Sequence, residues 1–364
     1  MKKSLLATAV LIALVGTSQA ATVYDKDGTT LTIGGRIQSL VMNGNFSKYA
    51  GDRDSSLINS ARFSIGGKTK INEWLSAYAF SEWDMADGNK AKIGDTIKAR
   101  EQYVGVDFGK FGKLQGGKTF DVTKSILTMT DLWEDIGIQN IIGLNGDRRT
   151  GVIRYDLNLN GFFLSLNYQT ASDDMKMFGN TVDVENGGGG ALGYTIDDVW
   201  FGPLTFKAAY SFLKGQNDFV DRFDKAQHAL AGVSWGRPNS GFYIAGIYNR
   251  YEIKNDLGYI GTIYKEQDYK AFEVTVAYNF DNGIGLYTGY NYWNSDLESA
   301  AVDPLLGRTH TKAIYRRVPV AVKYNFNANF KIWTEAEFDA NSDVRYNSKL
   351  RTGTLFSAGA RYTF

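Results

Sequence analysis

The chain ends with residues 353–364, which read GTLFSAGARYTF, and this stretch decides the fold. Its apolar residues fall on every second position and end on an aromatic ring: Phe356, Ala358, Ala360, Tyr362 and Phe364. Polar or small residues occupy the positions between them. Side chains of a β-strand point alternately to its two faces, so the stretch is predicted to be a strand with one apolar and one polar face.

The same period of two recurs along the whole chain, in residues 31–41, 60–65, 162–168, 204–212, 272–280, 314–324 and 330–338. Charged residues such as Arg36 and Arg62 share the polar register. A strand that crosses a membrane in a barrel turns apolar side chains to lipid and polar ones to a water-filled interior. After residue 20 no stretch is apolar for the roughly 18 residues that a spanning helix needs. The chain is therefore predicted to cross a membrane with strands.

Composition supports a β-protein and excludes several classes. The 364 residues include 40 glycines, 22 tyrosines and 22 phenylalanines but only 4 prolines, and aromatic side chains suit strands while proline removes a ladder donor. The absence of cysteine excludes a disulfide scaffold. With 40 basic and 39 acidic side chains, the surface has no charge excess that would attract nucleic acid.

The N-terminus is predicted to be a secretory signal peptide, residues 1–20. Lys2 and Lys3 precede an apolar run from Leu5 to Val15, and small residues lead to Ala20. Residues 21–364 are then one domain.

The connections predict how many strands there are, because bacterial barrels alternate short periplasmic turns with longer extracellular loops. Short turns are predicted at residues 71–73, 109–112, 158–161, 197–198, 237–241, 281–283 and 327–329. Longer polar segments are predicted near 44–57, 84–95, 119–147, 171–188, 214–225, 252–268, 294–312 and 340–352. Seven turns and eight loops join sixteen strands in an all-β, 16-stranded antiparallel transmembrane β-barrel. Within the fourth loop, Gly187–Gly190 is interpreted as a flexible loop end.

The two ends of the mature chain resemble the general (trimeric, diffusion) porins of enteric bacteria. The resemblance covers essentially the whole mature chain, including the opening Ala21–Gly28 with its Tyr-x-Lys-Asp-Gly core and the final Tyr362-Thr363-Phe364. It implies a homotrimer in the Gram-negative outer membrane, in contact with lipid and lipopolysaccharide, that passes small hydrophilic solutes and ions passively. It also implies that the barrel-assembly machinery recognises Phe364, and that the third loop folds inward.

The resemblance also implies a pore constriction. The third loop, Thr119–Asp147, places Asp131 and Asp135 on the family's two constriction carboxylates, and Glu134 is a third candidate. The opposing basic wall falls on Arg36, Arg62, Arg100 and Arg148, with Arg149 an alternative to the last. Alternation independently turns the first three arginines inward. Opposed charges would set up a transverse field that orients dipolar solutes.

The loop tip departs from the family's usual Pro-Glu-Phe-Gly-Gly, since it reads Glu134-Asp135-Ile136-Gly137-Ile138. The path that the third loop takes in that family is therefore not assumed for this chain.

Other functions remain as rivals. A channel specific for an anion or oligosaccharide would need an aromatic track, for which Trp133, Tyr287 and Trp333 are candidates, and a barrel enzyme or adhesin is a third hypothesis. His228 and His310 lack a surrounding nucleophile motif, so we expect no catalytic, cofactor or metal site.

One motif is rejected. Residues 112–119 fit the nucleotide-binding pattern G-x-x-x-x-G-K-[ST], but they are predicted to form a turn and a barrel strand rather than a strand, loop and helix.

Overall fold

The computed structural model of the chain describes residues 20–44, 57–90, 97–136, 148–177, 180–216, 223–255, 264–299, 310–344 and 353–364. The strands found there are β1 (Ala21–Lys26), β2 (Thr29–Gly44), β3 (Leu57–Lys70), β4 (Ser76–Lys90), β5 (Lys98–Asp107), β6 (Lys113–Phe120), β7 (Arg148–Leu159), β8 (Phe162–Gln169), β9 (Ser172–Met177), β10 (Asn180–Val199), β11 (Gly202–Gly215), β12 (Phe223–Arg237), β13 (Ser240–Asn255), β14 (Tyr264–Asn279), β15 (Ile284–Ser299), β16 (His310–Asn325), β17 (Phe330–Asp339), β18 (Asp343–Val344) and β19 (Leu355–Thr363). Two short helices are η1 (Gly109–Phe111) and α2 (Lys124–Leu127).

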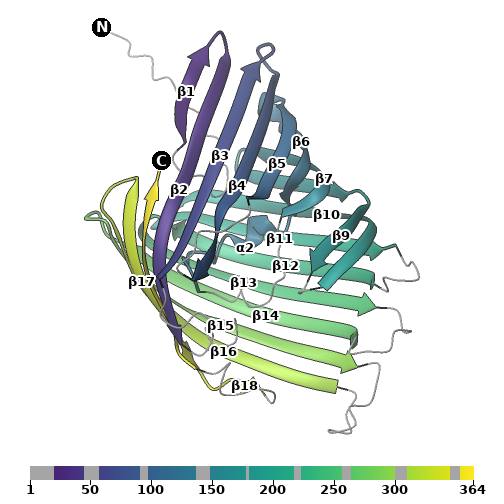
Figure 1. Cartoon of the computed structure of the whole chain (residues 1–364), viewed down its shortest axis with the longest axis vertical. Coiled ribbons are helices and arrows are strands. Elements are labelled where there is room, and N and C mark those ends of the chain that lie inside the picture. The colour runs from purple at the N-terminus through teal and green to yellow at the C-terminus, as the bar shows by residue number, and fades with distance from the viewer. Residues whose placement is uncertain are drawn as a thin grey trace.

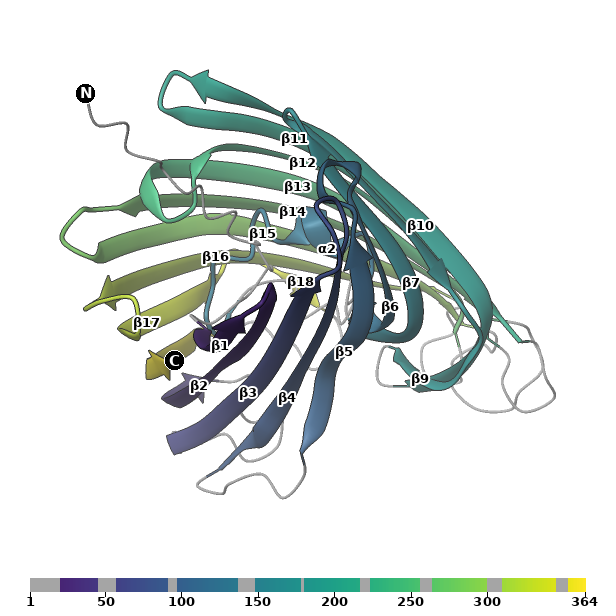
Figure 2. The same ribbon diagram turned by 90° about the horizontal axis from the view of Figure 1, so that it is seen from above.

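Sixteen antiparallel strands close into a barrel, which confirms the predicted fold class (Figures 1 and 2). Each long strand pairs with its neighbour along the chain, and β19 returns to pair with β2. The short strands β1, β9 and β18 add to β2, β10 and β16. The closing strand therefore lies beside the strand that carries Arg36, as the strand count predicts, with Thr363 opposite Arg36 itself.

The two faces of the barrel have opposite character. On β14, Phe272 is 44% exposed while Glu273 is 4% exposed, and on β17 Phe338 is 46% exposed while Glu337 is 1% exposed. A soluble protein would place these residues the other way round. The exposed apolar belt and charged inner face are the arrangement of a barrel in lipid, and they confirm the predicted alternation.

Six of the predicted short turns lie between consecutive strands, and the seventh is wrong. β10 continues through Asp197-Asp198 to Val199, and the turn follows at Trp200 and Phe201. Aromatic packing stabilises this longer hairpin. Phe201 stacks on Trp235 with ring centroids 4.1 Å apart, and the Trp235 Nε1–H donates to the Val199 carbonyl.

The interpretation of Gly187–Gly190 as a loop end is also wrong, because all four glycines lie inside β10 and pair with both β8 and β11. The absence of a side chain leaves space at this part of β10. A Cβ on Gly189 would lie 2.9 Å from Cγ2 of Val122 and 2.8 Å from Oδ1 of Asn167. The bare backbone lets the segment after β6 approach the wall. Strands likewise take up most of the predicted loop 171–188.

The rejected nucleotide-binding motif is a strand, as predicted. Residues Lys113–Phe120 form β6, which pairs with β5 and β7. Residues 1–19 of the predicted signal peptide lie outside the described part of the chain.

Candidate functional site

Three of the predicted wall arginines gather on neighbouring strands. Arg36 of β2 stands opposite Arg62 of β3 in the strand register, and Arg100 comes from β5. Their carboxylate partners lie on β4, between β3 and β5. Arg62 Nε lies 3.0 Å from Asp84 Oδ1, and Arg100 reaches Asp84 Oδ2 at 3.0 Å and Glu82 Oε1 at 2.7 Å. Sequence reasoning missed both carboxylates.

Arg36 differs from its neighbours in having no such partner. Within the described residues no carboxylate lies within ion-pair distance of its guanidinium, and its buried Nε–H donates to no protein group. Positive charge is therefore concentrated at this point of the wall.

Arg148 has a carboxylate partner of its own. Its Nε is 3.5 Å from Glu101 Oε1, and its guanidinium carbon sits 4.3 Å from the centroid of the Phe120 ring. The neighbouring Arg149 points elsewhere, with Nη1 3.1 Å from Oδ2 of the fully buried Asp121. Arg148 and Arg149 therefore pair with different carboxylates, Glu101 and Asp121.

Asp121 anchors the start of the third loop. Its carboxylate accepts hydrogen bonds from the Thr123 backbone and hydroxyl and from Ser211, in addition to the Arg149 ion pair. Burial alone would raise the pKa of this carboxyl. The Arg149 charge and the hydrogen bonds outweigh burial and lower the pKa to about 2.

The described part of the loop, residues 121–136, contacts the polar face of strands far along the chain. Tyr243 of β13 donates to the Met129 carbonyl at 2.8 Å. Thr130 donates to Glu273 of β14 at 2.7 Å and accepts from Thr275. Apolar loop side chains pack with strand residues in one buried cluster: Val122, Ile126, Leu127 and Met129 with Ala191, Ala209, Leu230, Tyr243, Ala245, Ile247 and Ala277.

A buried carboxylate binds the backbone of the loop tip. Glu335 of β17 accepts the backbone N–H groups of Glu134, Asp135 and Ile136, at 2.7, 2.9 and 3.3 Å. Three converging amides satisfy a buried anion that would otherwise be costly. Alternation predicts that Glu335 points inward, but nothing in the local sequence relates it to the loop.

Glu134 itself is surrounded by cations. Its carboxylate lies 2.9 Å from Lys323 Nζ, 2.5 Å from Lys331 Nζ and 2.6 Å from Arg361 Nη1. Burial favours the neutral form, but the three positive charges outweigh it and hold the pKa of Glu134 well below its usual range. The three basic residues come from β16, β17 and β19, and sequence reasoning did not assign them to the site.

The other two loop carboxylates have different partners. Asp135 Oδ2 accepts hydrogen bonds from Trp333 Nε1 at 2.6 Å and from the Ser357 hydroxyl at 2.8 Å. Asp131 pairs with Lys124 Nζ of its own loop at 3.1 Å. Trp333, a predicted sugar-stacking ring, is only 3% exposed and is engaged with the loop, so it offers no open face to a solute.

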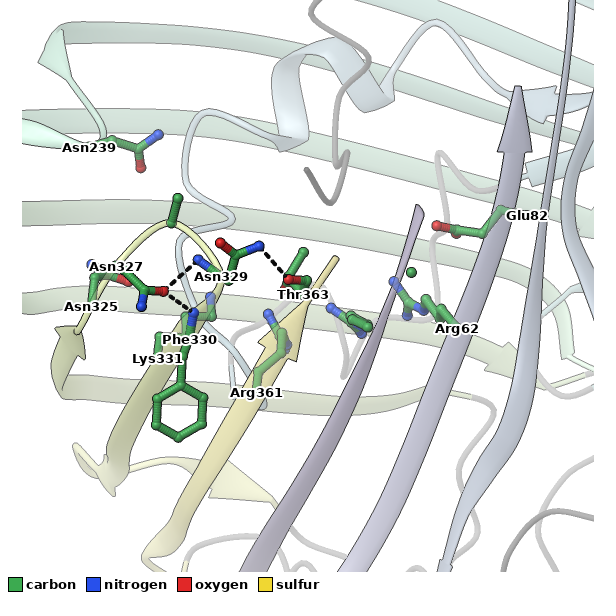
Figure 3. Close-up of a pocket in the computed structure, with 13 residues that line it drawn as sticks. Arg62, Glu82, Asn239, Asn325, Asn327, Asn329, Phe330, Lys331, Arg361 and Thr363 are labelled. Carbon is green, nitrogen blue, oxygen red and sulfur yellow. Dashed lines mark hydrogen bonds between the residues drawn. The ribbon is translucent and has the colours of Figure 1, made fainter. Parts of the chain in front are cut away.

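A cavity of about 470 Å³ lies between the arginine cluster and the short turn that joins β16 to β17 (Figure 3). Its charged lining residues are Arg36, Arg62, Lys331, Arg361 and Glu82. At the turn, Asn327 Oδ1 accepts the backbone N–H groups of Asn329 and Phe330, which holds this rim of the cavity in place. The site is thus a polar, mainly basic space inside the ring of strands.

Comparison with known proteins gives a consistent result. A family model described as Gram-negative porin matches residues 7–344. Outer membrane porin C of Enterobacter cloacae is 25% identical, over 99% of this chain and 98% of its own length. Among solved structures, OmpF of Salmonella typhi in complex with daunomycin has a TM-score of 0.70 at 19% identity, covering 94% of this chain and all of that one. The trimer form of OmpT of Vibrio cholerae has a TM-score of 0.66 at 16% identity, covering 93% and 100%.

Proposed function

Because the chain belongs to the Gram-negative porin family, we propose that it forms a water-filled channel for passive diffusion of small hydrophilic solutes and ions across the outer membrane. The observation that carries this function is the closed ring of sixteen strands, apolar outside and charged inside. Charged side chains keep a lumen wet, since a water-filled interior solvates them and lipid does not. The protein is located in the outer membrane as a multi-strand barrel.

The third loop is proposed to fold inward and to narrow this channel. Its contacts with Tyr243, Glu273 and Glu335, all on the polar face of the wall, support that path. In this proposal Arg36, Arg62, Arg100 and Arg148 form the basic side of the constriction. Of the acidic loop residues, Glu134 and Asp135 are held against β16–β19, and Asp131 is the most exposed.

The channel is proposed to assemble as a homotrimer through the outer face of β2–β5. Ser39 and Asn59 lie on this outer face and hydrogen-bond to each other at 2.7 Å, and Ala77 and Ala79 of β4 are small. These side chains lie among large apolar ones such as Ile37 of β2 and Val104 of β5, whereas β11 exposes the aromatic rings of Phe206 and Tyr210. Small and polar side chains suit contact with protein better than contact with lipid. The similar trimer form of OmpT supports the same assembly.

The proposal also covers the two termini of the chain and its remaining partners. Residues 1–20 are cleaved on export, which mass spectrometry of the mature N-terminus would test. Phe364 is presented to the barrel-assembly machinery, and in the folded barrel its backbone pairs with Gly35 at 2.9 and 3.0 Å. The outer face contacts lipid and lipopolysaccharide. The protein is proposed to have no enzymatic activity and no cofactor.

Planar-bilayer recording tests the channel. Purified folded protein should produce stepwise current increases that are proportional to the applied voltage. The same sample unfolded by heat should give none. Folded protein that inserts into the bilayer without current steps would contradict the proposed function.

A further inference from the structure

The cavity of Figure 3 is lined by more cationic than anionic side chains, and the carboxylates near it already have partners. Four of its lining side chains, Arg36, Arg62, Lys331 and Arg361, are cationic, and only Glu82 is acidic. The nearby carboxylates are turned toward other partners. Asp84 is shared by Arg62 and Arg100, and Glu82 binds Arg100. The water-filled space therefore faces more positive than negative charge.

Arg36 is the centre of this excess. A guanidinium carries five N–H donors and no acceptor, so it can be satisfied only by acceptors or anions. Its buried Nε–H donates to no protein group in the described part of the chain, and its strand neighbour Arg62 is another cation. Two cations side by side without a carboxylate between them repel each other, and a bound anion removes this repulsion.

Glu134 does not cancel the excess at Arg36. The loop carboxylate is already shared by Lys323, Lys331 and Arg361 and is 8% exposed. It offsets part of the positive charge on the β16–β19 side of the cavity and forms no ion pair with Arg36 on the β2–β3 side.

We infer that this cavity binds small anions weakly, with Arg36 as the principal donor, and that the channel therefore passes anions in preference to cations. The inference rests on the proposed channel function and adds its ion preference. The cavity holds an anion such as hydrogen phosphate together with several waters, so binding is loose enough for the ion to leave. It describes a preference of a diffusion channel, not a site dedicated to one solute.

Reversal potentials across a KCl gradient test the inference. Wild type should show chloride more permeant than potassium. Arg36→Gln removes one charge while keeping a polar side chain of similar reach. A unit charge about 6 Å from a monovalent ion in water changes the local ion concentration about threefold, upward for chloride and downward for potassium, so the chloride-to-potassium permeability ratio should fall about tenfold. Inorganic phosphate at pH 8 should reduce the wild-type KCl current saturably, and because hydrogen phosphate carries two negative charges, Arg36→Gln should need about tenfold more phosphate.

Arg250→Gln is the matched control. Arg250, like Arg36, lies on a strand, and its change to Gln also removes one positive charge. Arg250 belongs to the outer register of β13, however, and pairs with Asp268. The chloride-to-potassium permeability ratio of Arg250→Gln should equal that of wild type. Lys331→Gln, at a second lining cation, gives the same test if Arg36→Gln does not fold.

Two failures can be told apart. Clear channel steps with cation preference, with no preference, or with an unchanged ratio in the lining variants would overturn the anion inference and leave the channel standing. Absence of steps in wild type would overturn both.

Discussion

The attachment of the loop tip to Glu335 makes a quantitative prediction. The carboxylate accepts three backbone N–H groups, of Glu134, Asp135 and Ile136, through both of its oxygens. Glu335→Gln keeps the size of the side chain but leaves one acceptor oxygen and no charge. Hydrogen bonds to a charged group contribute about 1.5–3 kcal/mol each. Weakening two of them should therefore lower the free energy needed to open the loop tip by about 3 kcal/mol.

The assay is amide hydrogen exchange of residues 134–136, followed by mass spectrometry in detergent. A change of about 3 kcal/mol in local opening lowers protection about 100-fold. The barrel itself should melt at nearly the wild-type temperature, because Glu335 pairs with the loop while the strand ladders are unchanged. Lys323 keeps its other partner, Glu134, so no lone charge is left buried.

Glu337→Gln is the control for burial. Glu337 lies two residues further on the same face of β17 and is equally buried, but it accepts from Asn291 Nδ2 at 3.4 Å rather than from the loop. Its variant should leave exchange at 134–136 unchanged. Equal protection in wild type and Glu335→Gln, or an equal loss in both variants, would refute the assignment of Glu335 as the loop anchor.

Three further predictions concern the loop and its base. Gly189→Ala should lower stability by about 1–3 kcal/mol in thermal unfolding, because its Cβ would meet Val122 and Tyr210, whereas Gly190→Ala, with its nearest contact at 3.4 Å, should have little effect. Asp121→Asn leaves Arg149 without its buried partner and should cost about 3 kcal/mol. The Asp121 pKa of about 2 lies below the unfolded value of about 3.9, so this contribution is complete above pH 4 and is lost as pH falls toward 2; the variant should flatten that part of the melting curve against pH. Glu134→Gln should raise the chloride-to-potassium permeability ratio up to about tenfold, and wild-type selectivity should show no step near pH 4.3 from Glu134, since its pKa lies well below that value.

The individual strands could be predicted because their signal is local. Alternation at residues 330–338 or 356–364 requires only that one face meets lipid and the other meets water. The same rule placed Arg36, Arg62 and Arg100 on one face. Six of the short turns also followed from local turn residues, while the turn near Asp197 did not, because the packing of Phe201 on Trp235 lengthened the hairpin.

The partners of these charges could not be predicted from spacing. The sequence placed Asp131 and Asp135 opposite the arginine wall through a family resemblance. In the structure the ion-pair partners of Arg62 and Arg100 are Asp84 and Glu82, from the strand between them. The period of two predicts which side chains face the lumen. Many residues face it, so the period does not predict which of them form ion pairs.

The kind of barrel follows from the amino-acid sequence alone: the period of two, the alternating short and long connections, and the closing strand that ends at Phe364. The arrangement of charges inside the barrel depends on the three-dimensional fold. Glu134 meets Lys323, 189 residues away, because closing the ring brings β16–β19 beside the third loop. Gly187–Gly190 likewise read as a loop by composition but form a strand, because the backbone pairs with β8 and β11 on its two sides, and Gly189 leaves space there for Val122 of the third loop. Local periodicity follows from backbone geometry, whereas the pairing of distant charges depends on which strands the closed ring makes neighbours.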